Sequence, residues 1–235
     1  LLQDNPDTLV GMMLHVYDSY QTPLSSELLD FYGQPGQPLI WVDGYWTQAG
    51  STGNGNANAA SIGALVDQAS TTTDVTIDIQ GQALSESDYE LDVTVGVEPG
   101  GAARSMRVYV TQVYSDTSWP EADEQQFNTQ RQSAPTQHIV LQPGESWSYS
   151  HVFTLTGESL DVDNVNFIVW AQDDLASPPA MIRQVAMHGH GDVPPCDCVG
   201  DLNCSYNVNV DDLLTVIAGW NNPYNVDDLL EVISA

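Results

Sequence analysis

The sequence YELDVTVGV at residues 89–97 places apolar side chains at every second position, and MRVYVTQVY at residues 106–114 does so at 106, 108, 110 and 114. This is the period of a β-strand that buries one of its two faces. Five further strand-like segments lie between residues 74 and 188, separated by Gly, Pro, Ser and Asp: 75–79, 138–141, 147–155, 165–173 and 180–187. About seven short strands joined by such turns predict an antiparallel β-sandwich over residues 74–188. Within it, the alternation predicts an inward-facing core that includes Val108, Val110, Phe167 and Val169.

Residues 1–70 have a different pattern, in which strand and helix signals alternate. We expect a strand at 9–16, a helix at 25–31, a strand at 39–42 and a helix at 57–68. Asp43-Gly44, directly after the second strand, is a hairpin-turn signal. This stretch therefore predicts an α/β segment in front of the sandwich.

The stretch FYGQPGQPLIWVDG, residues 31–44, resembles the second half of a thioredoxin-like fold. The resemblance implies a cis peptide bond before Pro38 and redox cysteines facing it. Thiol chemistry requires a Cys-X-X-Cys pair with a lowered pKa, and this sequence contains none. Either the pair precedes Leu1 or the domain is a structural remnant. With the sandwich, residues 1–188 are similar to bacterial secreted or outer-membrane proteins that join these two domains.

The charge balance excludes two classes of partner. The chain has 32 acidic residues, four arginines and no lysine, which gives a formal net charge of −28. Such a surface repels nucleic acid and anionic lipid, because no basic patch can neutralise their phosphates. No apolar run approaches the ~20 residues needed to span a bilayer. We therefore expect a secreted protein that neither binds nucleic acid nor crosses a membrane, and whose upstream residues were cleaved or left out of this sequence.

Residues 189–198 are a linker by composition, and the three cysteines lie in or just after it. Cys196, Cys198 and Cys204 favour one disulfide and one spare thiol in an oxidising compartment, with the pairing open. Together with His188 and His190 they could also hold zinc or copper by ligand type. The spacing matches no defined metal site, so the linker interpretation is favoured.

Residues 199–235 contain an internal repeat. The hexapeptide Asn-Val-Asp-Asp-Leu-Leu occurs at 209–214 and again at 225–230, and both copies continue into a Val-Ile pair. Leu213, Val216, Ile217 and Trp220 have helical spacing. The repeat predicts two short helices that pack on each other.

Residues 201–212 have the spacing of a twelve-residue calcium loop. Oxygen-bearing side chains stand at loop positions 1, 3, 5, 9 and 12, and Ca²⁺ prefers six to eight oxygen ligands. With the repeated helix, residues 199–235 resemble a type I dockerin, the small calcium-binding module of secreted bacterial proteins. The resemblance implies one Ca²⁺ with the following ligands: Asp201, Asn203, Ser205 and Asp212 through side chains, Asn207 through its carbonyl, and Asn209 directly or through water.

Two features depart from the dockerin pattern. Ser205 replaces an acid, and Tyr206 stands where such loops favour Gly. The second copy places Ile217 and Gly219 at ligand positions, so we expect no second ion. The alternative is a metal-free helical hairpin with Asn and Asp caps.

Evidence for catalysis is weak. Asp173-Asp174 and the acids of 161–163 could be paired catalytic carboxylates, but turn-capping is the simpler interpretation. No nucleophile elbow, phosphate loop or zinc-protease motif occurs. His15, His138 and His151 are interpreted as strand residues.

The favoured function is an extracellular or cell-surface binding or structural protein whose tail, ordered by calcium, attaches to another protein or to another copy of this chain. The alternative is an extracytoplasmic thiol-disulfide oxidoreductase whose cysteine pair lies upstream of Leu1. A third and weaker hypothesis is a carbohydrate-active accessory protein.

Overall fold

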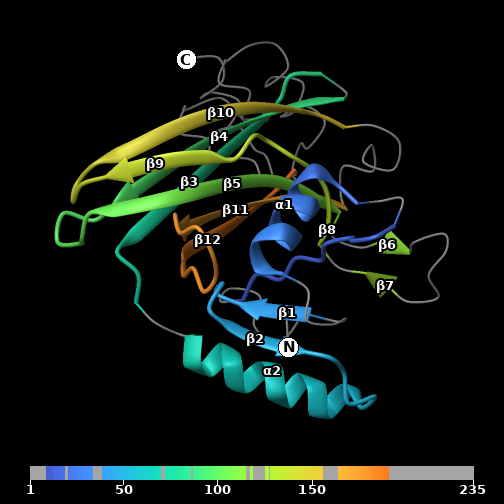
Figure 1. The fold of residues 1–235 in the computed structure, drawn as a ribbon. Coiled ribbons are helices and arrows are strands. Elements are labelled where there is room, and N and C mark those ends of the chain that lie inside the picture. The colour runs from blue at the N-terminus through green and yellow to red at the C-terminus, as the bar shows by residue number, and fades with distance from the viewer. Residues whose placement is uncertain are drawn as a thin grey trace, which may run out of the picture. The chain divides into compact units, whose positions relative to one another are not determined.

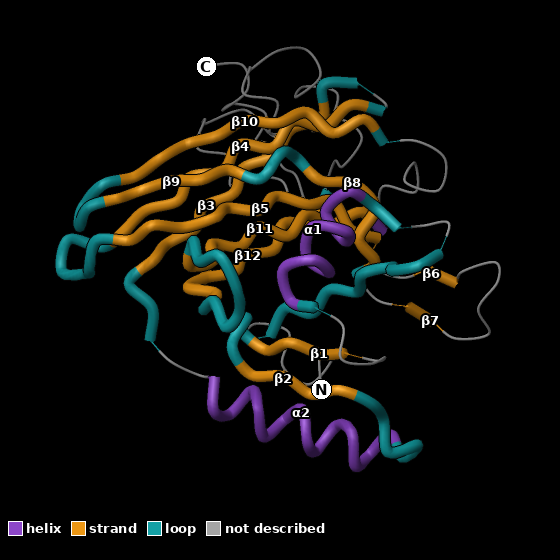
Figure 2. Tube along the Cα trace, viewed as in Figure 1, coloured by secondary structure: helices purple, strands orange, loops and turns teal. Residues whose placement is uncertain are grey.

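The computed structural model describes residues 9–18, 21–33, 39–69, 72–85, 87–114, 117–118, 125–126, 128–155 and 164–190. All of these residues belong to one compact unit that ends at His190. Strands make up most of it, as Figure 2 shows. The predicted cis bond at Pro38, the acids of 161–163, the cysteines and the tail of 199–235 lie outside the described residues.

Two antiparallel sheets form the body of the protein (Figure 1). The three-stranded sheet has the order β10-β4-β3, with bounds β3 Val75–Ala83, β4 Asp88–Val97 and β10 Ser146–Thr154. The five-stranded sheet has the order β12-β11-β5-β8, and β9 also pairs with β5; its bounds are β5 Arg104–Tyr114, β8 Thr129–Ser133, β9 Gln137–Leu141, β11 Val165–Asp173 and β12 Ile182–Gly189. A small separate pair consists of β6 Thr117–Ser118 and β7 Gln125–Gln126. The predicted β-sandwich is confirmed, and each of the seven predicted segments overlaps one of its strands.

The predicted core residues all face the space between the two sheets. Val108, Phe167 and Val169 have no exposed surface, and Val110 is 2% exposed. In the register of β5 with β11, Val110 stands opposite Val169, so their side chains leave the same face of the sheet. The core that they join also contains the buried residues of β3, β4 and the end of β10.

Helix α1, Pro23–Tyr32, covers the other face of the five-stranded sheet. It begins in a capping box: the Ser25 N–H donates to Thr22 Oγ1 at 3.1 Å, and the Thr22 N–H donates to Ser25 Oγ at 2.8 Å. Leu24 and Leu28 of this helix pack in a second buried cluster with four residues of β5 and β11: Tyr109, Val113, Ile168 and Trp170. The helix expected at 25–31 is confirmed.

The predicted strand at 9–16 is wrong. Only Met13 makes a bridge, to Thr129, through hydrogen bonds of 3.0 Å from its N–H to the Asn128 carbonyl and to its own carbonyl from the Gln130 N–H. Alternate side chains of the segment pack against the α1 cluster instead: Val10, Met12 and Leu14. The alternating apolar side chains therefore pack on one side of an extended segment, but the backbone of that segment does not form a continuous ladder with a neighbouring strand.

A hairpin and a helix complete the N-terminal part, namely β1 Leu39–Val42, β2 Trp46–Ala49 and α2 Gly55–Ala69. The turn is at Asp43-Gly44, as predicted, with φ of 47° and 66°. Two features require glycine at position 44. Its φ is positive, and a Cβ there would lie 2.1 Å from the Ala180 carbonyl oxygen. The Ala180 N–H donates to the Gly44 carbonyl at 3.1 Å, which holds the hairpin turn against the segment before β12.

The Phe167→Ala variant is expected to lose about 3–5 kcal/mol of unfolding free energy, because the ring is fully buried and stacks on Tyr89. Denaturant unfolding measures this loss. Val140→Ala, at a β9 position that is 67% exposed, is the control and is expected to change stability by less than ~0.5 kcal/mol. A loss below ~1 kcal/mol at Phe167 would contradict its place in the core.

Candidate functional site

The predicted calcium ligands Asp201, Asn203, Ser205, Asn207, Asn209 and Asp212 lie outside the described residues. Within the part of the chain that the structure describes, no group of three or more His, Cys, Asp or Glu side chains has the arrangement of a metal site. No helix there is long and apolar enough to cross a membrane. The candidate site in the body must therefore be sought among other kinds of side chain.

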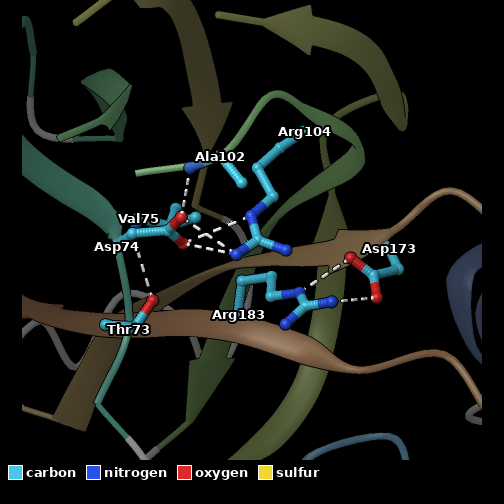
Figure 3. Close-up of polar contacts among 7 residues, drawn as sticks. All are labelled: Thr73, Asp74, Val75, Ala102, Arg104, Asp173 and Arg183. Atoms are coloured by element: carbon cyan, nitrogen blue, oxygen red, sulfur yellow. Dashed lines mark hydrogen bonds and ion pairs between the residues drawn. The ribbon is translucent and has the colours of Figure 1, made fainter. Parts of the chain in front are cut away.

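The adjacent acids Asp173 and Asp174 at the end of β11 do not converge on one cleft. Asp173 accepts two hydrogen bonds from Arg183, of 2.8 and 2.7 Å (Figure 3). Asp174 accepts a bond of 2.7 Å from Arg107 Nε, and its other oxygen lies 3.0 Å from His138 Nδ1. His138 and Arg107 lower the pKa of Asp174, which makes this carboxyl a poor proton donor near neutral pH. Both acids serve in ion pairs, so their interpretation as turn caps is corrected and the structure gives no support to a catalytic pair.

A third ion pair joins the two sheets. Asp74, directly before β3, accepts hydrogen bonds of 2.9 Å at both carboxylate oxygens from Arg104 Nη2, at the start of β5 (Figure 3). The Ala102 N–H adds a bond of 2.8 Å. Arg104 holds the pKa of Asp74 below its usual range. Because three of the four arginines are neutralised by aspartates in this way, the body presents acidic charge to solvent; the fourth, Arg131, lies in β8.

The described histidines have different surroundings. His188, 8% exposed, has Nε2 3.0 Å from the Tyr89 hydroxyl, and the His190 ring centroid lies 4.4 Å from the Tyr89 ring centroid. Gly81 makes room for the first contact, since a Cβ there would lie 2.3 Å from the Tyr89 hydroxyl oxygen. His138 in β9 and His151 in β10 are strand residues, as predicted. His15 is not, because it lies outside any strand and pairs with Asp18 at 2.7 Å.

The strongest candidate for a binding surface is a row of rings on β10, formed by Trp147, Tyr149 and His151 and called here the β10 aromatic row. The Trp147 and Tyr149 centroids are 5.6 Å apart with planes 8° from parallel, and the Tyr149 and His151 centroids are 6.2 Å apart at 14°. The three side chains are half-buried, on the core-facing side of an edge strand. Burial raises the pKa of Tyr149 and lowers the pKa of His151, so the row is uncharged at neutral pH.

The sequence alone predicted a strand at 147–155 but did not single out this row as a site. Its signal was present as Ser146-Trp147-Ser148-Tyr149-Ser150-His151, in which small and aromatic residues alternate without a charge. This local sequence does not show whether a neighbouring strand covers the rings. Strand order, which depends on long-range pairing, decides this.

Comparison with known proteins supports the fold only. No family model and no curated protein matches the sequence. HBP35 of Porphyromonas gingivalis is similar in structure, with a TM-score of 0.52 at 14% identity over 71% of this chain. The match spans 58% of that protein, less than two thirds of its length. A domain of the outer membrane lipoprotein Omp28 from Porphyromonas gingivalis matches with a TM-score of 0.37 at 11% identity, over 51% of this chain and 89% of that domain.

The Asp74→Asn variant is expected to lower the unfolding free energy at neutral pH by about 1–2 kcal/mol, since a neutral amide replaces the carboxylate that accepts charge-assisted hydrogen bonds from Arg104. The pKa of Asp74 is lower in the folded state than in the unfolded chain. The stabilisation is therefore fully present above about pH 4 and is lost as the pH falls through the lowered folded-state value.

Unfolding free energies measured from pH 7 to pH 2.5 are thus expected to fall less steeply for Asp74→Asn than for the unmodified protein. Asp78→Asn, on the exposed face of β3, is the matched control and is expected to keep the original slope. Identical acid profiles for Asp74→Asn and the unmodified protein would show that the Asp74–Arg104 ion pair does not contribute to stability.

Proposed function

We propose that this protein is an extracellular or cell-surface binding protein of bacterial type, in which a β-sandwich body carries a C-terminal tail ordered by one Ca²⁺. The observation that carries the proposal is the twelve-residue loop of 201–212, with oxygen ligands at the spacing of a calcium loop. The loop is followed by a helix sequence that recurs sixteen residues later. The assignment of residues 199–235 as dockerin-like, and of residues 1–70 as part of a thioredoxin-like domain, belongs to the same proposal.

Charge supports calcium as the ligand of the tail. Asp201, Asp211 and Asp212 concentrate negative charge in a chain that is already at −28. A divalent cation relieves that repulsion, and extracellular calcium modules work with dissociation constants of about 10⁻⁴–10⁻³ M. The acidic body is compatible with a medium rich in cations, where salt screens its self-repulsion.

Calcium binding would supply folding energy to the tail. Each helix of the repeat is short, and isolated helices below ~12–15 residues are marginal in water. Asp212 belongs to both the loop and the first helix, so coordination links the two and the binding energy becomes folding energy.

The ordered tail would then serve as an attachment point. Leu213, Val216 and Ile217 would pack against Leu229, Val232 and Ile233 of the second copy, but a two-helix unit of this size leaves apolar surface uncovered. That surface would be covered by another protein or by another copy of this chain. The body supports binding over catalysis, since Asp74, Asp173 and Asp174 are held by arginines.

Isothermal calorimetry on the full chain is expected to show one calcium site that the Asp212→Ala variant weakens about ten-fold or more. Asp228→Ala changes the matching residue of the second copy and is the control, because that copy lacks a ligand set. Limited proteolysis is expected to cut the tail faster in EGTA than in calcium, while the sandwich stays intact. No heat at millimolar calcium, together with equal protease resistance in EGTA, would reject the proposal.

A further inference from the structure

Strand β10 forms one edge of the three-stranded sheet (Figure 1), and half of its backbone groups point away from that sheet. The Val97 N–H donates to the Glu145 carbonyl at 3.0 Å, and the Leu155 N–H donates to the Ser87 carbonyl. These bonds flank the β10–β4 ladder in its own register, so odd-numbered residues of β10 bond to β4. The even-numbered residues direct N–H and C=O outward. The Thr154 carbonyl confirms this direction, because it accepts a bond of 3.1 Å from Gln132 Nε2 in β8.

The sequence of β10 itself contains none of the residues that usually prevent edge pairing. Natural edge strands are protected by charges, prolines, bulges or short length. β10 has nine residues, SWSYSHVFT, without a Gly, a Pro, an Asp, a Glu, a Lys or an Arg. The other edges in the described sheets differ: β3 contains Asp78 and Gly81, β12 contains Arg183, β8 contains Arg131, and β9 has only five residues.

The two faces of this edge have opposite character. On the core-facing side, the β10 aromatic row is half-buried, and its partners in β4 are fully buried core residues. On the outer side, the cross-strand neighbours of Ser150, Val152 and Thr154 are Asp92, Glu90 and Asp88. Ser150 Oγ donates to Glu90 at 3.0 Å, and Thr154 Oγ1 donates to Asp88 at 2.8 Å. An added strand would thus meet rings on one face and carboxylates on the other.

Charge identifies the occupant. A strand beside β10 would lie about 10 Å from β4, two strand spacings away, within reach of Lys or Arg side chains that point outward. Its inward side chains would cover the aromatic row and would have to be apolar. A second copy of this chain does not fit, because it has no lysine and would bring its own Asp88, Glu90 and Asp92 to the same junction.

We propose that β10, at residues 148–152 where no described strand pairs with its outer edge, binds an extended segment of another protein in which apolar residues alternate with Lys or Arg, and that this segment adds to the sheet as a strand next to β10. Main-chain hydrogen bonds from Ser148, Ser150 and Val152 supply affinity, and the two unlike faces fix the register, since a slip by one residue would exchange them. This proposal does not depend on calcium binding by residues 199–235.

The test uses the full chain and a fluorescent synthetic peptide in which Val alternates with Lys. Fluorescence polarisation is expected to show binding, and a peptide of the same composition with its Val and Lys in separate blocks is expected to bind at least about ten-fold more weakly. Equal binding of the two peptides would reduce the interaction to attraction between net charges and would overturn the proposal.

The backbone is tested on both partners. Ser150→Pro removes an outward N–H and leaves the main-chain bonds to β4 in place, and it is expected to raise the dissociation constant about ten-fold relative to Ser150→Ala, which loses the same hydroxyl bond to Glu90 but keeps the N–H. Two peptides, N-methylated on alternate residues in opposite phase, test the same point if that variant does not fold: only the phase that faces β10 is expected to abolish binding. Unchanged binding by both methylated peptides would overturn strand addition.

Asp92→Asn tests the attraction between the β4 carboxylates and the lysines of the peptide. It is expected to weaken binding about two- to three-fold at low salt, and at high salt the variant and the unmodified protein are expected to bind equally. Sedimentation of the chain alone is expected to give a monomer at the concentrations of the assay. A dimer that Ser150→Pro dissociates would assign the edge to a second copy of this chain and would overturn the proposed partner.

Discussion

The pairing of β11 with β5 is the interaction on which the rest of the described structure depends. These strands lie side by side over the nine residues from Val165 to Asp173, and both of their faces are covered. One face packs against the three-stranded sheet through Phe167 and Val169, and the other packs against α1 through Ile168 and Trp170. The pair thus holds three layers together, and the two acids at the C-terminal end of β11, Asp173 and Asp174, pair with Arg183 and Arg107.

Double coverage explains which parts of the fold could be predicted from the sequence. A strand buried on both faces is a continuous apolar run, and one buried on a single face alternates, so 165–173 and 89–97 were both recognisable. β8 was not, because TQRQS has neither pattern and is held by its ladder with β5 and by the Met13 bridge. The extended segment around Met13 gave the opposite error: its side chains alternate because they contact the α1 cluster, and this contact produces the same sequence pattern as a strand.

The candidate sites show the same division between local and long-range information. A calcium loop is a local pattern, since one short stretch supplies every ligand, and it could be predicted from residues 201–212 without a fold. The ion pairs of Asp74 with Arg104 and of Asp174 with Arg107 join residues far apart in the chain, so no sequence spacing predicts them. The β10 aromatic row depends on both kinds of information. Its residues can be found in the local sequence, but whether a partner can reach them depends on β10 being the last strand of its sheet.

The acidity of the chain and the unprotected edge of β10 are best understood together. An edge strand without a charge, a proline or a bulge is a hazard for self-association. Here the protection stands one strand away, in Asp88, Glu90 and Asp92 of β4, and not on β10 itself. Two copies approaching edge to edge would bring these carboxylates together, whereas a strand with outward Lys or Arg would be attracted by them. Protection of this kind discriminates between partners, because the carboxylates repel the chain's own copies and attract a segment of opposite charge.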